Sequence, residues 1–226
     1  MNEALWVLGR ATGVSTLVML TVATALGVVM SGGFRHRELP RFALAEIHRR
    51  ASLLATGLLV VHVLSLWLDA EAQLDAVDLL VPFLNARNPL WWGLGTLALD
   101  LLLIVVVSSL LRKRLPHAVW RGLHLLAYAS WPFAVLHSVG GGTDSATWWV
   151  RLTAITCCAV VGGAVGYRLV RRSGSRLVHR SGSRLGRTLP PTGRPVSAKS
   201  APAANPAPAA ATTTATTTAT VQEYPS

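Results

Sequence analysis

Four histidines stand inside apolar stretches of the sequence, two on each of two segments and at nearly equal spacing. His48 and His62 are 14 residues apart, and His124 and His137 are 13 residues apart. Ionisable side chains inside membrane helices are costly and usually face a functional site. A single such histidine is equally well explained by a hydrogen bond to a neighbouring helix, but four at matched spacings indicate a shared role.

The spacing predicts which histidines meet. Fourteen helical residues rise about 21 Å, so the two histidines of one segment lie at different depths of a hydrocarbon core about 30 Å thick. The two segments are separated by one further span and therefore run parallel, which pairs His48 with His124 and His62 with His137. Two imidazoles facing across a gap suit the axial positions of a haem iron. A zinc site needs more nitrogen, sulfur or oxygen ligands at each pair.

The second histidine-bearing segment contains two further residues of interest. Thirteen residues leave His137 about 140° out of phase with His124 on a regular helix. Pro132 lies between them, and we expect it to kink the helix and change its phase. Trp131 lies about midway between the two histidine levels. We expect it to face inward, where it would fill the gap between them and shape the electron path; facing lipid it would only add bulk.

Charged residues near the histidines have both functional and simple interpretations. Arg49, Arg50 and Arg121 adjoin the pair of His48 and His124 in sequence and could bind haem propionates, for which arginine offers a fork of donors. They could equally be cytoplasmic anchoring charges. Asp100 falls near the middle of an apolar segment, where a lone carboxylate is expensive and is expected to have a partner or a raised pKa. A structural hydrogen bond, proton coupling and a quinone contact are the roles we consider for it.

Long apolar segments must position these side chains. The chain has 226 residues, of which 51% are hydrophobic and only 14% are charged, unlike an ordinary soluble domain. In lipid every backbone polar group must pair internally, so segments of about 20 apolar residues are expected to be membrane helices. We expect an all-α membrane protein with five transmembrane helices, at residues 8–30, 46–68, 90–111, 118–139 and 148–169.

The distribution of charge predicts the orientation. The formal net charge is +11, but the basic residues lie between and after the apolar segments, which favours membrane anchoring over nucleic-acid binding. Basic loops follow the first and third segments and a basic tail follows the fifth, whereas the other two loops are acidic or lack lysine and arginine. Because positive loops stay in the cytoplasm, we expect a multi-pass protein of the bacterial plasma membrane, with its N-terminus outside and its C-terminus inside.

The composition changes near residue 171. An arginine-rich stretch contains Ser-Gly-Ser-Arg-Leu twice, at 173–177 and 181–185, and a Pro/Ala/Thr-rich tract follows it. Such a segment cannot bury enough apolar surface to offset chain entropy. We therefore expect a transmembrane domain over residues 1–170 and a disordered cytoplasmic tail over residues 171–226.

Four short motifs resemble the ferric-reductase-like transmembrane domain, over about residues 5–170. They are Glu46-Ile47-His48-Arg49-Arg50, Leu59-Val60-Val61-His62, Trp120-Arg121-Gly122-Leu123-His124 and Val135-Leu136-His137. The resemblance implies two b-type haems stacked across the membrane, with His48, His62, His124 and His137 as their ligands. The high Ala, Leu, Val and Arg content is similar to the actinobacterial branch of the family.

One departure from the family, the lack of an FAD- and NADPH-binding module, shapes the expected function. No strand–GxGxxG–helix unit follows the apolar segments, so no flavin or nicotinamide site is expected in this chain. We therefore expect an electron-transfer subunit of an oxidoreductase, supplied by quinol or by a separate flavoprotein. The alternative is a haem-free membrane scaffold or transporter whose histidines line a metal or proton path. The acceptor, the direction of electron flow, the oligomeric state and the number of haems, one or two, stay open.

Overall fold

A computed structural model describes residues 3–32, 40–69, 74–84, 88–141 and 147–188. All regular secondary structure in these residues is helical. The chain divides into two units, residues 1–182 and residues 183–226. The first unit contains all the helices discussed below, and the second is described only for the last residues of the final helix.

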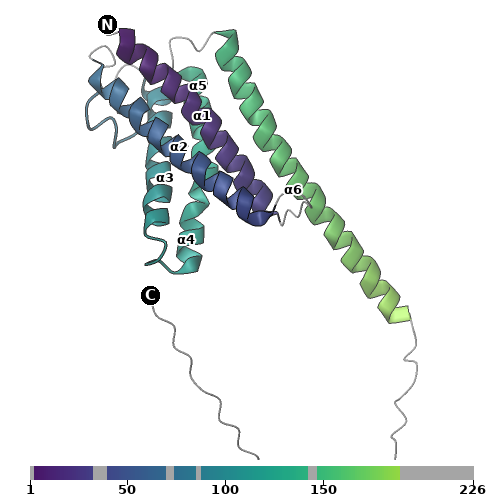
Figure 1. The fold of residues 1–226 in the computed structure, drawn as a ribbon. Coiled ribbons are helices and arrows are strands. Elements are labelled where there is room, and N and C mark those ends of the chain that lie inside the picture. The colour runs from purple at the N-terminus through teal and green to yellow at the C-terminus, as the bar shows by residue number, and fades with distance from the viewer. Residues whose placement is uncertain (1–2, 33–39, 70–73, 85–87, 142–146, 189–226) are drawn as a thin grey trace, which may run out of the picture. The chain divides into compact units, whose positions relative to one another are not determined.

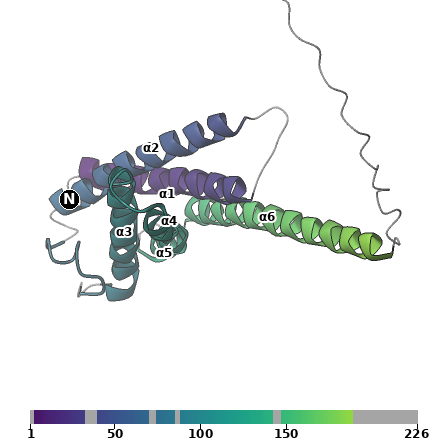
Figure 2. The same ribbon diagram turned by 90° about the horizontal axis from the view of Figure 1, so that it is seen from below.

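The described residues form six helices, which run alternately up and down except that α5 continues in the direction of α4 (Figure 1). Helix α1 packs along α2, and α3 packs along α5. Helix α5 also contacts α1 and so joins the two helix pairs, as the view from below shows (Figure 2). The helices are α1 (Glu3–Ser31), α2 (Arg41–Leu68), α3 (Pro89–Leu110), α4 (His117–His124), α5 (Leu126–Gly140) and α6 (Trp148–Thr188).

Four helices of the described chain are long and apolar enough to cross a membrane: α1, α2, α3 and the Trp148–Arg171 part of α6. Many of their large apolar side chains are exposed, among them Leu53, Leu103 and Ile155. Exposed apolar faces of this extent suit contact with lipid. The chain is thus a multi-pass membrane protein, and these helices correspond to four of the five expected spans.

The remaining expected span, residues 118–139, is divided into α4 and α5. The division falls at Leu125, and Pro132, where we expected the kink, lies inside α5. At the division the backbone forms tighter turns. The Leu125 N–H donates to the Gly122 carbonyl at 3.1 Å, and the Tyr128 N–H donates to the Leu125 carbonyl at 3.0 Å. Such three-residue turns wind the chain more per residue than an α-helix, so the phase changes seven residues before the proline.

Helix α6 continues beyond the boundary expected from composition. It ends at Thr188, so residues 171–188 are helical where we expected disorder. The segment contains no proline, and the helix stops just before Leu189-Pro190, where the residue preceding a proline disfavours helical backbone. The rest of the expected tail, residues 189–226, lies outside the described residues.

The contacts between α1, α5 and α6 form the apolar core of the first unit. Leu17, Val135, Ala154 and Cys157 are buried together, and Trp131 packs against them. The segment before α3 also folds onto that helix. The Thr96 hydroxyl donates to the Asp78 carbonyl at 2.8 Å. This hydrogen bond holds the loop against α3.

Candidate functional site

The structure brings the four intramembrane histidines together as two pairs. His48 of α2 faces His124 at the end of α4, with ring centroids 6.2 Å apart and ring planes at 73°. His62 of α2 faces His137 of α5, with centroids 6.5 Å apart and planes at 75°. These are the pairs expected from the parallel course of the two segments. Following the orientation expected from the loop charges, His48–His124 is the inner pair and His62–His137 is the outer pair.

Helix α1 holds both histidines of α2. The Nδ1–H of His48 donates to the Ala23 carbonyl at 2.9 Å, and the Nδ1–H of His62 donates to the Gly9 carbonyl at 2.7 Å. The two carbonyls are 14 residues apart on α1, as the two histidines are on α2. The spacings match because the two helices are antiparallel and pack along their length. Each histidine level therefore has its own anchor on α1.

Helix α3 holds His137 in the same way, because the Nδ1–H of this ring donates to the Trp91 carbonyl at 2.8 Å. A carbonyl oxygen can only accept, so the proton must sit on Nδ1 in all three rings. The Nε2 atom of each ring then carries the free lone pair. This is the tautomer in which an imidazole binds a metal while its other nitrogen is held by the protein.

His124 is held by stacking and lacks such a hydrogen bond. Its Nδ1 is buried and has no hydrogen-bond partner in the part of the chain that the structure describes. The indole of Trp120 lies against the ring, with centroids 5.2 Å apart and planes at 23°. The Arg112 guanidinium lies 4.5 Å from the Trp120 ring. His124 thus rests on a layered contact of cation, indole and imidazole, whereas His48 and both outer rings are fixed by backbone carbonyls.

Two glycines make room for the outer pair. A Cβ at Gly13 of α1 would lie 2.8 Å from His62 Cε1, and a Cβ at Gly95 of α3 would lie 2.6 Å from His137 Nδ1. Contacts this short force something to move, and here the neighbour is the imidazole itself. Sequence reasoning misses both glycines. The available signal is the Gly9–Gly13 spacing in an apolar helix, since small residues four apart permit close helix packing.

The chain matches the family model described as ferric reductase like transmembrane component over residues 8–135. The chain belongs to this family. The match begins in α1, includes His48, His62 and His124, and ends in α5 two residues before His137. No curated protein and no solved structure matches the chain. Membership makes this ferric reductase like chain a membrane redox component embedded in a lipid bilayer.

The donor set of each pair fits the haem that ferric reductase like domains generally bind. Within the described ranges no three His, Cys, Asp or Glu side chains form a metal-binding group, so each pair offers two imidazoles. A haem supplies four ligands of its own and takes two axial ones. With metal–nitrogen bonds of about 2.0 Å, two imidazoles on opposite sides of a metal have ring centroids roughly 6 Å apart. Both pairs have about this separation.

The arginines singled out from the sequence do not turn toward the histidine pairs of this ferric reductase like domain. Arg49 Nε lies 3.1 Å and Arg50 Nε lies 2.7 Å from the Glu46 carboxylate, and the two side chains are 70% and 77% exposed. Arg121 is also exposed. Glu46 is the anionic partner of both Arg49 and Arg50, and the three side chains form a local network on the surface.

Trp131 and Asp100, the other two candidates, differ in position. Trp131 is half-buried and faces inward, as expected, with its Nε1–H donating to the Thr21 hydroxyl at 2.9 Å. Asp100 is half-buried on α3, and no hydrogen bond or ion pair of its carboxyl group is present among the described residues. Asp100 lies on the same face of α3 as the exposed side chains of Leu103, Ile104 and Val107. The structure therefore separates Asp100 from the histidine pairs.

Proposed function

We propose that this chain is the membrane subunit of a reductase and carries electrons across the bilayer through two bis-histidine b-type haems. The observation that carries the proposal is the pairing of four histidines at two levels, with three of the rings held through Nδ1 by backbone carbonyls. The family match supports a membrane redox role. The ring separations support two trans ligands at each level.

The protein residues would bind and orient the haems and exclude water. His48 and His124 would hold the inner haem, and His62 and His137 would hold the outer one. Bound haem supplies the one-electron chemistry, and the protein contributes ligands, spacing and a dry environment. Trp131, between the two levels, packs with the apolar core and would keep water out of the space between the sites. The two histidines of each pair would hold one haem from both sides, so we expect no ligand exchange at its iron.

A separate flavoprotein or a quinol is the electron donor we propose, consistent with the family description as a component. We further propose that α4 and α5 cross the bilayer together as the fifth span. Their combined course, from His117 to Gly140, is as long as the other spans.

Purified protein should be red and should show reduced-minus-oxidised bands of b-type haem, with two haems per chain. The expectation follows from two matched imidazole pairs, each sufficient for one haem iron. The measurement is a redox difference spectrum combined with haem and protein quantification. Colourless protein from cells with ample haem would contradict the proposal and favour a haem-free scaffold or transporter. One haem per chain would contradict the two-haem part alone.

Reporter fusions should place the N-terminus outside and the C-terminus inside. Basic residues Arg112, Lys113 and Arg114 follow α3 at the end of the bundle where α2 begins, and the acidic Asp75 and Asp78 lie at the opposite end (Figure 1). Positive loops favour the cytoplasm. A reporter after Ser226 should therefore behave as cytoplasmic, and one after Asp75 as external. The opposite result would reverse the inner and outer labels of the histidine pairs while leaving the pairs intact.

A further inference from the structure

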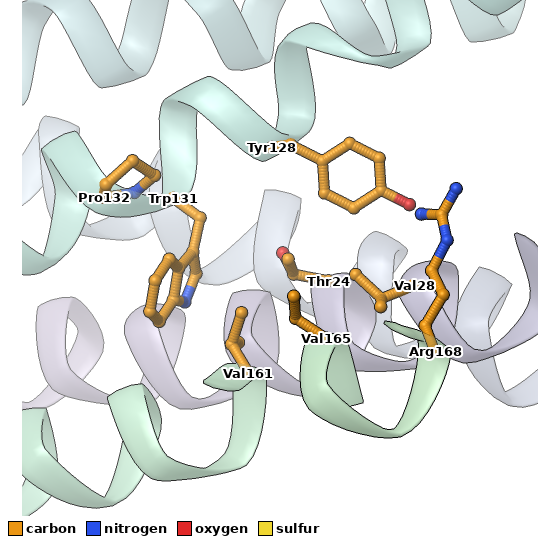
Figure 3. Close-up of a pocket in the computed structure, with 8 residues that line it drawn as sticks. All are labelled: Thr24, Val28, Tyr128, Trp131, Pro132, Val161, Val165 and Arg168. Carbon is orange, nitrogen blue, oxygen red and sulfur yellow. The ribbon is translucent and has the colours of Figure 1, made fainter. Parts of the chain in front are cut away.

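A cavity of about 360 Å³ lies between α1, α5 and α6 (Figure 3). Its walls are mostly apolar. The Tyr128 hydroxyl and the Arg168 guanidinium point toward the same end of the cavity, away from Trp131 and Pro132. The cavity therefore combines an apolar space with one cationic, hydrogen-bonding end. Its lining residues are Thr24, Val28, Tyr128, Trp131, Pro132, Val161, Val165 and Arg168.

The cavity adjoins the inner histidine pair. A Cβ placed on Gly27 of α1 would lie 3.4 Å from the Tyr128 hydroxyl and 3.7 Å from His48 Cε1. The hydroxyl and the imidazole therefore flank the same small residue. Tyr128 also follows His124 by four residues, across the Leu125 division. A molecule held by the inner pair could thus extend into the cavity past Tyr128.

Arg168 is placed differently from the arginines on the surface. Its side chain is half-buried, although Tyr167 and Leu169 beside it are exposed. Its aliphatic stem lies at the end of α1, where a Cβ on Gly32 would approach Arg168 Cγ to 3.2 Å. No ion pair or hydrogen bond of Arg168 is present in the described part of the chain. A guanidinium beside apolar walls is costly without an anionic partner, so this one suits an anionic group of a ligand.

We propose that Arg168, assisted by the Tyr128 hydroxyl, binds a carboxylate of the haem held by the inner pair. The inference rests on the proposed function and extends it to α6, a helix without an intramembrane histidine. Haem joins a large apolar ring to carboxylates at one edge, which is the combination that this cavity offers. Arginine binds carboxylates through charge-assisted hydrogen bonds. Arg168 is then a positioning residue of the inner site.

The test measures haem release from the full-length chain to an excess of a haem-accepting apoprotein. A His62→Ala background leaves only the inner haem to be followed. Arg168→Gln should release this haem about tenfold faster, the scale of a charge-assisted hydrogen bond, and Arg168→Lys should fall between that variant and the parent. Arg171→Gln removes an equal charge one turn further along α6, where Arg171 is exposed and stacks on Tyr167, and should leave the rate unchanged.

Haem dimethyl ester, whose carboxylates are blocked, identifies the group that Arg168 recognises. The parent protein should release the ester faster than haem, and this difference should be much smaller in Arg168→Gln, where only the Tyr128 hydroxyl is left to bind the carboxylate. Haem-loaded Arg168→Gln that discriminates against the ester as strongly as the parent would overturn this inference and leave the proposed function standing. Unchanged haem release with altered binding of a quinone analogue would also overturn it and assign the cavity to a quinone. Wild-type protein without haem would instead defeat the proposed function itself.

Discussion

Loss of single histidines should group by level in the membrane. His48→Ala and His124→Ala should each remove the inner haem and leave the outer one, and His62→Ala and His137→Ala should do the reverse. The reason is geometric. The rings of each pair are 6.2 or 6.5 Å apart, whereas the two levels are separated by 14 residues of α2, or about 21 Å. No haem can take ligands from both levels.

Haem quantification and redox titration of the four variants measure this grouping. Each variant should retain one haem of the expected two and one of the two midpoint potentials. His117→Ala is the matched control, since His117 begins α4 and its ring lies beside Trp120, 5.8 Å between centroids. It should keep both haems. Two partners of one pair that lose different haems would show that the pairing is wrong.

Adding one methyl group at Gly95 or Gly13 should empty the outer site and spare the inner one. The new Cβ would lie 2.6 Å from His137 Nδ1 in Gly95→Ala and 2.8 Å from His62 Cε1 in Gly13→Ala. The imidazole must then leave its position and the hydrogen bond to its backbone carbonyl. Overpacking of this kind costs about 1–3 kcal/mol in protein cores, and here the cost falls on a ligand of the proposed haem.

Spectra and haem content of the glycine variants test this effect. Gly57→Ala is the control, because it lies on α2 between the two histidines and a Cβ there meets nothing within 4 Å. It should keep both haems. Gly95→Ala with a fully occupied outer site and an unchanged midpoint potential would contradict the tight enclosure of His137. Loss of both haems would indicate general misfolding, which Gly13→Ala checks independently from another helix.

The sequence by itself determined four of the apolar spans and the pairing of the four histidines. Both follow from the length of the apolar segments and from the spacing of residues along a single helix. About 20 apolar residues must span the membrane as a helix, and a 14-residue spacing places His48 and His62 on one face at two depths. Alternation of up and down helices then makes the second and fourth spans parallel. The pairs with His124 and His137 follow without knowledge of any contact, and ring separations near 6 Å agree with them.

Only the tertiary structure decided how the outer pair is enclosed and which arginine lines the cavity beside the inner pair. Gly13 and Gly95 meet the outer pair from α1 and α3, and Arg168 lines the cavity from α6. These contacts depend on the rotation and register of the helices. Adjacency in sequence singled out Arg49, Arg50 and Arg121 as possible propionate partners, but Arg49 and Arg50 lie on a surface face, where Glu46 pairs with them. The division at Leu125 likewise emerged only in the structure. Residues near in sequence can point to opposite sides, so the contacts that enclose the histidine pairs emerge only when the helices are placed together.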